Sequence, residues 1–309
     1  MVSSRISEQS LYMEVTELKE QLKRQGQGQK QLHVVDCRFW LDQPAKGYES
    51  YLIEHIPNAI YMDLDRDLSS SRKEHGGRHP LPEPEQLART LTLHGISKQD
   101  TVVAYDEQGG AMASRLIWLL QWIGHEGDVY VLDGGYAAWQ QAGVVSEAGT
   151  ASPRAELKQP YEPNVRSELV VGVEHVRSKL GNPTVRFIDS REHVRYIGEV
   201  EPIDPKAGHI PGALNRFWRD GLNEQGYVRR NNEEKAVWHH LVDGAEEIIV
   251  YCGSGVTACP NVLSLWRSGF QNVKLYAGSW SDWCSYEESR SPVATGEASL
   301  NDPIKDSEG

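Results

Sequence analysis

The sequence predicts an α/β protein made of two tandem domains, each a mainly parallel sheet flanked by helices. Two observations support this prediction. Each half of the 309-residue chain alternates short runs of β-branched residues with amphipathic stretches, which is the pattern of βαβ units. The two halves also contain the same short sequence pieces in the same order, which indicates that one structural unit occurs twice.

Four landmarks define this internal repeat. An Asp-x-Arg piece ends a strand-like run in each half, and a His-Ile-Pro piece follows it. A second strand-like run comes next, and a tryptophan-containing piece closes the series. The matching positions are Asp36 and Asp189, His55 and His209, Asp106 and Cys252, and 132–139 and 276–283. Their common order and nearly constant spacing leave little room for chance similarity.

The repeat divides the chain into an N-terminal domain at 1–150 and a C-terminal domain at 164–309. The segment 151–163 is predicted to be a linker, because prolines interrupt any hydrophobic periodicity there. The polar, acidic tail at 295–309 is expected to fray. The segment 1–22 has a polar, helical pattern without the apolar stretch of an export signal.

Composition limits the classes of partner. The net charge is -12 and no basic tract offsets it, so neither nucleic acid nor an anionic membrane is expected as a partner. No apolar run approaches the roughly 20 residues that span a bilayer. The four cysteines have neither zinc-site nor disulfide spacing, which suits a reducing compartment, and a cytoplasmic protein is expected. An anionic substrate then requires a local positive site.

The run that ends at Cys252 predicts an active-site loop. Ile248–Tyr251 has the apolar character of a buried strand, and Gly253 and Gly255 allow the backbone to curl tightly after it. In such a loop, amide N–H groups can converge on the cysteine sulfur. A helix is predicted over 258–268, so the sulfur lies near a helix N-terminus, which favours a reactive thiolate.

Together these motifs resemble those of the two-domain rhodanese-like sulfurtransferases. The resemblance rests on the tandem repeat, the Gly-His-Ile-Pro-Gly-Ala and Gly-Ser-Trp-Ser-Asp-Trp pieces, and the loop Cys-Gly-Ser-Gly-Val-Thr at 252–257. It covers roughly 32–293. The loop is similar to that of the 3-mercaptopyruvate sulfurtransferases, whereas thiosulfate-preferring members usually carry Arg and Lys at the places of Gly253 and Ser254.

The resemblance implies a reaction. As a thiolate, Cys252 is expected to attack the sulfur of a small anionic donor, 3-mercaptopyruvate, which gives an enzyme persulfide and pyruvate. An acceptor such as thioredoxin, a low-molecular-weight thiol or cyanide then removes the outer sulfur. The scheme needs no cofactor and no metal. Thiosulfate is the alternative donor, and a protein sulfur-relay module that needs no small donor is the second alternative.

The resemblance also implies the residues that assist the cysteine. A Ser, His and Asp set falls on Ser254, His79 and Asp65, the last two from the first domain, which places the site between the domains. Nearby residues of the same types leave the choice of histidine and aspartate open. These rivals are His75, Asp63 and Asp67.

The donor's anionic group is expected to bind Arg195, whose planar guanidinium suits a carboxylate. Arg191 is a second candidate, although it can instead pair with Asp189 at the end of its own strand. Four loop residues complete the expected donor site, namely Gly253, Gly255, Val256 and Thr257.

One position departs from the family pattern. Nine residues after Arg195, this chain has Asp204 where many mercaptopyruvate enzymes have a second arginine. A carboxylate cannot replace that cation. Lys206, Arg216 or Arg219 then has to supply the charge.

The repeat also separates an active from an inactive half. Asp106 stands at the place of Cys252 and cannot act as a sulfur nucleophile, so the first domain is predicted to be catalytically inactive. A cysteine phosphatase is disfavoured, because Ala258 stands where its loop requires an arginine. The remaining cysteines and the His-Ile-Pro histidines are predicted to be structural; they are Cys37, Cys259, Cys284, His55 and His209.

Overall fold

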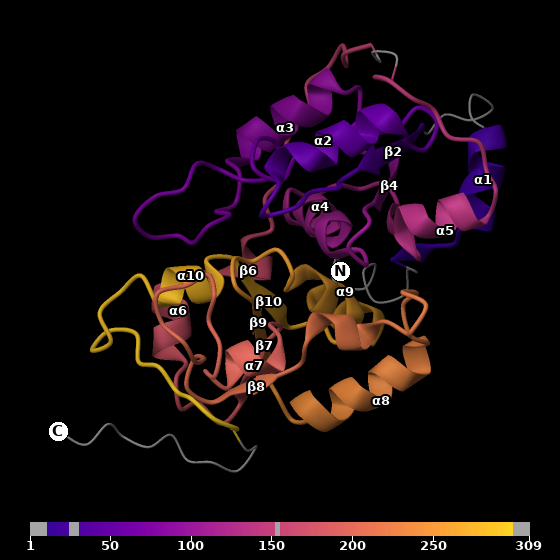
Figure 1. The fold of residues 1–309 in the computed structure, drawn as a ribbon. Helices are drawn as coiled ribbons and strands as arrows, with labels where there is room; N and C mark the ends of the chain where they lie inside the picture. Colours follow the sequence, from indigo (N-terminus) through magenta and orange to yellow (C-terminus); the bar gives the residue numbers. More distant parts are fainter. Residues whose placement is uncertain (1–10, 25–30, 152–154, 299–309) are drawn as a thin grey trace.

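Two five-stranded parallel sheets organise the part of the chain that the structure, a computed structural model, describes: residues 11–24, 31–151 and 155–298. Figure 1 shows the two units one above the other. The strand order is β1-β5-β4-β2-β3 in the first sheet and β6-β10-β9-β7-β8 in the second. The strands are β1 (Tyr12–Met13), β2 (Leu32–Asp36), β3 (Ile60–Tyr61), β4 (Thr101–Tyr105), β5 (Val129–Leu132), β6 (Val170–Val171), β7 (Val185–Asp189), β8 (Ala213–Asn215), β9 (Glu247–Tyr251) and β10 (Val273–Tyr276).

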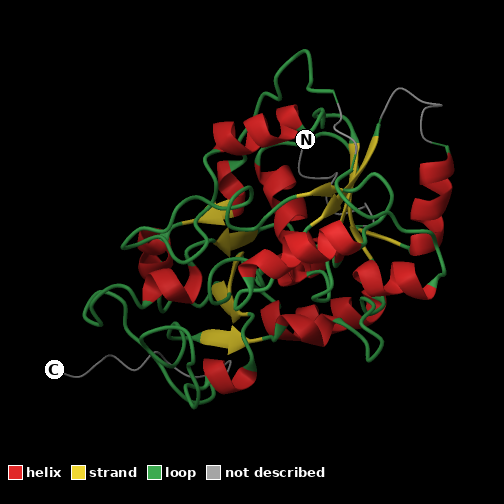
Figure 2. Ribbon diagram, turned by 45° about the horizontal axis from the view of Figure 1, so that its top comes forward, coloured by secondary structure: helices red, strands yellow, loops and turns green. Residues whose placement is uncertain are grey.

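Helices surround both sheets (Figure 2). They are α1 (Val15–Lys23), α2 (Pro44–Ile53), α3 (Pro84–Leu93), α4 (Ala111–Trp122), α5 (Gly135–Gln141), α6 (Val173–Ser178), α7 (His193–Tyr196), α8 (Asn231–Val242), α9 (Cys259–Arg267) and α10 (Ser279–Trp283). Short 3₁₀ segments occur at Ser167–Leu169 and Trp218–Gly221. None of the helices in the described ranges has the length and apolar character needed to span a bilayer.

The two sheets have the same topology, which confirms the internal repeat. Strands β1 to β5 correspond in order to β6 to β10, and the central strand of each sheet, β4 or β9, is buried along nearly its whole length. Strands buried on both faces read as continuous apolar runs, as these two do. The predicted fold class, two tandem α/β domains built on parallel sheets, is therefore correct.

Each Asp-x-Arg piece holds the carboxyl end of its sheet together. The Arg191 guanidinium pairs with Asp189 at 2.6 Å and donates to the Gly208 carbonyl at 2.6 Å. Arg38 forms the same pair with Asp36, also at 2.6 Å. All four side chains are buried, so the pairs tie each strand end to the loop that carries the His-Ile-Pro piece.

The two His-Ile-Pro histidines make structural contacts, as predicted. Nδ1 of His55 contacts the Tyr51 carbonyl, and Nδ1 of His209 contacts the Tyr196 carbonyl, both at 2.8 Å. Each imidazole also stacks on the ring of that tyrosine. The histidines thereby close a turn in their own domains and do not reach the cysteine loop.

The domains meet where α4 of the first packs against α9 of the second. Every residue of α4 is buried, and its sequence is mainly apolar around the whole helix, with Arg115 as its one charged residue. A second contact joins two backbones, because a Cβ on Gly77 would lie only 2.4 Å from the Gly278 carbonyl oxygen. Gly77 also has a φ of +86°, which favours glycine. At this point the backbones of the two domains are too close for a side chain to fit between them.

The predicted linker is attached to the first domain where the structure describes it. The Leu157 N–H donates to the Thr92 carbonyl at 3.1 Å, and the Tyr161 N–H donates to the Thr92 hydroxyl at 2.9 Å. The Tyr161 ring is buried and its hydroxyl contacts His125 at 3.2 Å. These contacts fix the path of the chain from 155 to 163, while 152–154 lie outside the described residues.

Two expectations about the chain ends need correction. The tail is held at its start, because Gly296 donates to the Ile197 carbonyl at 2.8 Å and Ala298 to the Tyr196 hydroxyl at 3.1 Å. Fraying therefore does not apply to 295–298, and 299–309 lie outside the described residues. Near the N-terminus the helix begins only at Val15, after the edge strand β1, and 1–10 are likewise not described.

The loop after the central strand of the first domain is filled by its own side chain. The Asp106 carboxylate accepts backbone N–H bonds from Gln108, Gly110, Met112 and Ala113 at 2.8 to 3.0 Å. The carboxylate is fully buried. Successive N–H groups that converge in this way form an anion-binding concavity, and here the bound anion belongs to the chain itself.

Replacing Asp106 is expected to destabilise the protein. Asp106→Ala leaves three buried N–H groups and one partly buried N–H group without an acceptor. Since each orphaned buried group costs about 1–3 kcal/mol, we expect a loss of about 3 kcal/mol or more. Asp106→Asn keeps one acceptor oxygen and should give an intermediate loss. Chemical denaturation measures both. An Asp106→Ala protein as stable as the wild type would contradict this account of the loop.

Candidate active site

Cys252 follows β9, the central strand of the second sheet, and is almost fully buried. Its N–H donates to the Ser279 hydroxyl at 3.1 Å, and its carbonyl accepts from the Trp280 N–H at 3.0 Å. The next carbonyl, of Gly253, accepts from the Ser281 N–H at 2.9 Å. The start of α10 therefore fixes the backbone on both sides of the sulfur.

Gly255 turns the loop back toward the sulfur. Its N–H lies 3.2 Å from Cys252 Sγ, which suits a sulfur that carries negative charge. The residue has a φ of +76°, and a Cβ here would lie 2.2 Å from the Ala277 carbonyl oxygen, so glycine is required. The helix α9 begins at Cys259, close to the predicted start. A loop N–H, rather than the helix end itself, contacts the sulfur.

The three residues predicted to assist the cysteine lie in contact with one another. Ser254 Oγ is 2.8 Å from His79 Nδ1, and His79 Nε2 is 3.4 Å from Asp65 Oδ1. Ser254 and His79 are buried, whereas the Asp65 side chain is 56% exposed. The first domain thus supplies two members of the set and the second domain supplies the serine beside the cysteine.

The rival residues have other partners. His75 Nδ1 contacts the Ser285 hydroxyl at 2.8 Å. Asp63 accepts the Arg66 N–H at 3.0 Å, and Asp67 pairs with the Arg66 guanidinium at 2.6 Å. Of these candidates, His79 is the histidine that contacts Ser254, and Asp65 is the aspartate that contacts His79.

The surroundings of His79 set its protonation state. Burial lowers the pKa of His79, although Asp65 acts in the opposite direction, so the imidazole is neutral at neutral pH. A carboxylate only accepts hydrogen bonds, which places the ring proton on Nε2. Nδ1 then accepts the Ser254 hydroxyl proton. This arrangement can take a proton from the serine or return one to it.

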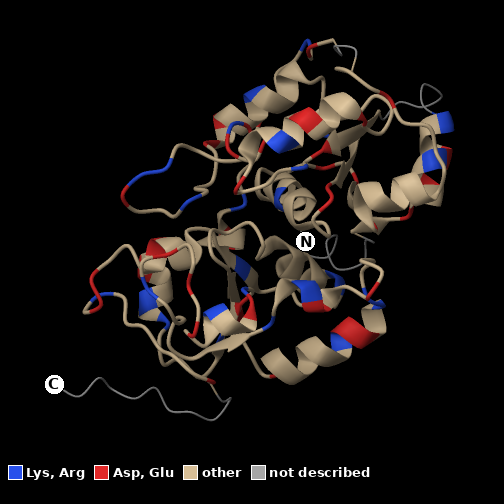
Figure 3. Cartoon of the chain, viewed as in Figure 1, with Lys and Arg blue, Asp and Glu red and all other residues tan. Residues whose placement is uncertain are grey.

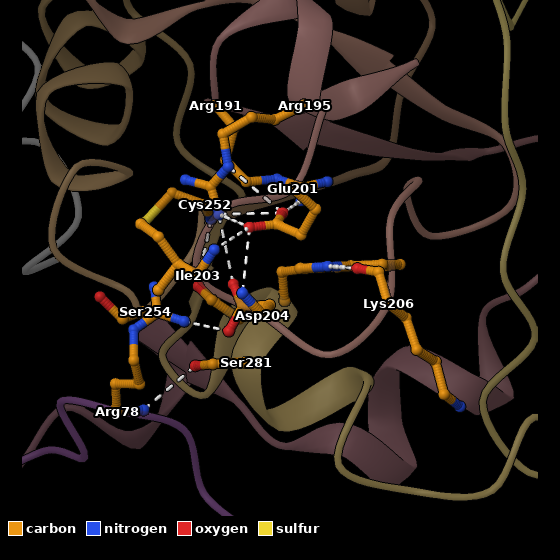
Figure 4. A network of polar contacts seen from close by, with 12 residues as sticks. Arg78, Arg191, Arg195, Glu201, Ile203, Asp204, Lys206, Cys252, Ser254 and Ser281 are labelled. Atoms are coloured by element: carbon orange, nitrogen blue, oxygen red, sulfur yellow. Dashed lines mark hydrogen bonds and ion pairs between the residues drawn. The ribbon is translucent and has the colours of Figure 1, made fainter. Parts of the chain in front are cut away.

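Arg195 faces two carboxylates of its own domain. Its Nη2 lies 2.7 Å from Glu201 Oε1 and 3.3 Å from Asp204 Oδ2. The other oxygen of Asp204 pairs with Arg78, which comes from the first domain. Figure 4 shows Asp204 between the two guanidinium groups. Two cations from different domains therefore share one carboxylate.

A cavity of about 310 Å³ lies between the domains, bounded on one side by the cysteine loop. Gly253, Ser254, Val256 and Thr257 line it, while Gly255 lies behind the wall and contacts the sulfur instead. A Cβ on Gly253 would lie 2.8 Å from Arg78 Nη2 and 3.7 Å from Arg195 Nη1, so both guanidinium groups face the loop. A small anion that enters the cavity therefore meets two arginines beside the cysteine loop.

The cations suggested as substitutes near Asp204 differ in where they point. Lys206 Nζ donates to the Tyr286 carbonyl at 2.8 Å, away from the network in Figure 4. Arg216 pairs with Glu234 at 3.0 Å. Arg219 lines the cavity and its guanidinium packs on the Trp218 ring. Of the three, Arg219 is the one that faces the cavity.

Arg191, predicted as a possible donor contact, is engaged by its own domain. Besides its pair with Asp189, it lies 3.2 Å from Glu201 and donates to the Gly208 carbonyl. It reaches the cavity wall. In the structure Arg191 therefore pairs with Asp189, which was the alternative to its role as a donor contact.

Sequence reasoning missed two arginines of the first domain. Arg78, described above, directly precedes His79, and this position next to a predicted site residue could have identified it. Arg115 on α4 donates to the Gly255 carbonyl at 3.1 Å and to the His79 carbonyl at 3.2 Å. Arg115 could have been identified as the single charged residue in a helix whose other residues are apolar or uncharged.

The other cysteines are free and buried, in agreement with a structural role. Burial raises the pKa of Cys37 well above its ordinary value, that of Cys259 to about 12 and that of Cys284 to about 11. These thiols are protonated at neutral pH. Among the residues the structure describes, no three His, Cys, Asp or Glu side chains are grouped to hold a metal ion.

Comparisons with known proteins agree with this arrangement. The model of the rhodanese-like domain matches residues 14–142 and 173–286. A probable 3-mercaptopyruvate sulfurtransferase of Pseudomonas aeruginosa is 43% identical over 269 residues, which cover 86% of this chain and 93% of that protein. A putative thiosulfate sulfurtransferase of Mycobacterium tuberculosis, SseB, is 35% identical over 268 residues, 86% of this chain and 91% of that one.

A solved structure extends the comparison to the fold. The crystal structure of SseA from Escherichia coli, described as a 3-mercaptopyruvate sulfotransferase, matches with a TM-score of 0.75 and 31% identity. The match covers 88% of this chain and 100% of that one. With both sheets, the cysteine loop and the family model in agreement, the chain belongs to the rhodanese-like family and contains two such domains.

Proposed function

We propose that this chain is a sulfurtransferase that moves a sulfane sulfur from 3-mercaptopyruvate through a Cys252 persulfide to a thiol or cyanide. The contact of Ser254 with His79 beside the cysteine loop carries the proposal, because it provides a hydroxyl for the donor's ketone. The relatives from Pseudomonas aeruginosa and Escherichia coli, which bear the name of this activity, support it. Thiosulfate is the second candidate donor, supported by the relative from Mycobacterium tuberculosis.

The first half-reaction balances without an external oxidant. The Cys252 thiolate attacks the thiol sulfur of 3-mercaptopyruvate, a sulfur–sulfur bond forms and the donor's carbon–sulfur bond breaks. The electron pair of the broken bond goes to carbon and gives the enolate of pyruvate. The new persulfide then loses its proton, and the enolate carbon takes up a proton. The products are the persulfide anion and pyruvate in its keto form.

Ser254 and His79 suit this proton transfer. The Ser254 hydroxyl can donate to the ketone oxygen where enolate charge develops, and such a donor is most effective when it is already held in place. The neutral His79 accepts from the serine and can pass a proton back through it. Asp65, at 3.4 Å, orients the ring from its exposed side.

Arg195 and Arg78 are proposed to hold the donor's carboxylate. Both guanidinium groups face Gly253 from the cavity, and planar guanidinium groups match a carboxylate in geometry. Asp204 and Glu201 already offset part of their charge. A site neutralised in this way favours a monoanionic donor over the thiosulfate dianion, which gains more from uncompensated cations.

In the second half-reaction an acceptor thiolate attacks the outer sulfur, the sulfur–sulfur bond breaks and the Cys252 thiolate is restored. Thioredoxin or a low-molecular-weight thiol is proposed as the physiological acceptor. A cytoplasmic location is proposed with it, since the four cysteines are free and a reducing compartment keeps them so. A sulfur-relay module remains the second alternative; the intact Ser254 and Arg195 favour a small-donor enzyme over it.

The donor assignment is tested by steady-state kcat/KM with 3-mercaptopyruvate and with thiosulfate. We expect the higher value with 3-mercaptopyruvate. Cys252→Ser is the control, because a hydroxyl cannot form a persulfide and transfer from both donors should disappear. A clear preference for thiosulfate would refute the donor assignment, and activity in Cys252→Ser would refute the nucleophile.

Ser254→Ala should separate the two donors. Loss of one preorganised donor to a developing oxyanion costs about 10²–10³ in kcat, so we expect that loss with 3-mercaptopyruvate. Thiosulfate has no ketone, and its turnover should fall much less. His79→Gln should show the same split, and Asp65→Asn a weaker one. Ser264→Ala, a buried serine bonded to Trp238 and Glu234, is the control and should affect both donors alike.

Arg78 and Asp204 are expected to change donor binding in opposite directions. Arg78→Gln removes a charge-assisted contact worth about 1.5–3 kcal/mol, so KM should rise about tenfold or more for both donors, with a smaller change in kcat. Asp204→Asn removes the carboxylate that pairs with Arg78 and one of the two that pair with Arg195, and it should lower KM for thiosulfate more than for 3-mercaptopyruvate. A higher KM for both donors in Asp204→Asn would show that the carboxylate orients the arginines instead of competing with the donor.

A further inference from the structure

Arg115 is a buried charge in an unusual place. It lies on α4, whose other residues are apolar or uncharged, and it is 0% exposed. In Figure 3, which has the view of Figure 1, α4 is mainly tan, whereas red and blue segments are frequent on the outer helices and loops. A fully buried ion without a counter-ion costs several kcal/mol, so its retention requires a reason.

The hydrogen bonds of Arg115 go to backbone carbonyls and to the thiol of Cys259. Nη1 donates to Gly255 at 3.1 Å, and Nη2 donates to His79 at 3.2 Å and to Leu68 at 3.4 Å. Nε has no hydrogen-bond partner. Within the described ranges no carboxylate forms an ion pair with this guanidinium. The carbonyl oxygens satisfy some of its N–H groups, but none of them neutralises its charge.

Two thiols are the ionisable groups that act on Arg115. Burial lowers the pKa of the arginine, and the thiols of Cys259 and Cys252 act in the opposite direction. Cys259 cannot be the counter-ion, because burial raises its pKa to about 12 and it stays protonated. That leaves the sulfur of Cys252, the residue that becomes anionic in the proposed reaction.

The other charged groups around the cysteine loop already have partners. Arg78 and Arg195 face Gly253 from the cavity, and both pair with Asp204. His79, the remaining titratable neighbour, is neutral for the reason given above. Arg115 is thus the cation at this loop that lacks a carboxylate within the described residues.

We propose that Arg115 is a positioning residue that serves as the counter-charge of the anionic Cys252 sulfur, in the thiolate and in the persulfide. It acts through geometry as well, because Gly255, whose carbonyl it binds, also offers its N–H to Cys252 Sγ at 3.2 Å. The same guanidinium holds the His79 carbonyl. One side chain of the inactive domain therefore fixes both the sulfur loop and the histidine. This inference rests on the proposed persulfide chemistry.

The first test follows alkylation of Cys252 by iodoacetamide as a function of pH, read by mass spectrometry of the peptide that contains it. An opposite charge close to an ionisable group shifts its titration by about 1–3 pH units, so the midpoint should move upward by about that much in Arg115→Met. Arg115→Lys keeps the charge and should stay near the wild type. Leu116→Ala, a buried apolar truncation on the same helix, controls for loss of packing and should not move the midpoint.

The second test compares melting temperatures of the protein with and without persulfide, loaded with thiosulfate and freed of it by gel filtration. The measurement is made at a pH below the alkylation midpoint of the wild type, so that loading exchanges a neutral thiol for a persulfide anion beside the buried cation. Loading should then raise the Tm of the wild type and of Arg115→Lys. The rise should be absent or reversed in Arg115→Met. Leu116→Ala should have a lower Tm overall but retain the rise.

The outcomes separate this inference from the proposed function. Alkylation needs no sulfur donor, so a shifted midpoint in Arg115→Met supports the counter-charge even if neither donor proves to be a substrate. An unchanged midpoint in Arg115→Met overturns the inference. An equal shift in Arg115→Lys also overturns it, because the effect of the substitution would then not depend on the charge of the side chain. If Arg115→Met does not fold, Arg115→Gln takes its place, because it removes the charge but keeps side-chain N–H donors: an upward shift of its midpoint supports the counter-charge, and an unchanged midpoint overturns it.

Discussion

The packing of α4 against α9 across the domain boundary is the interaction on which the site depends. It brings the carboxyl edge of the second sheet, where Cys252 lies, against the first-domain segment that carries His79. Neither domain holds a complete set of groups. The sulfur, the serine and Arg195 come from one half, while the histidine, the aspartate and two further arginines come from the other. Contact between the halves is therefore what assembles these groups around Cys252.

The repeat shows one loop used in two ways. In the first domain the N–H groups after the central strand close on the Asp106 carboxylate, and in the second a loop N–H points at Cys252 Sγ. The first copy thus shows the loop with an anion already bound to its N–H groups. The helix that starts after this loop carries Arg115 to the loop around Cys252.

Local sequence signals predicted the features that are encoded locally. Continuous apolar runs gave the central strands, glycines marked the loop around Cys252, and the repeated pieces gave the domain count. The family pattern selected Asp65 from three nearby aspartates, and the geometry agrees. What the sequence could not show depends on the docking of the domains. The pairing of Asp204 with Arg78 joins residues 126 positions apart, and the two-residue strand β1 is too short to produce a periodic signal.

The contact between Gly77 and Gly278 has a consequence for how this protein tolerates change. With a Cβ only 2.4 Å from the opposite carbonyl oxygen, even a single methyl group must wedge the halves apart. Gly77 immediately precedes the arginine and histidine of the site, so the displacement falls directly on them. We therefore expect a side chain at position 77 to move Arg78 and His79 relative to the loop around Cys252. The width of the cavity between the domains thus depends on the absence of a side chain at this position.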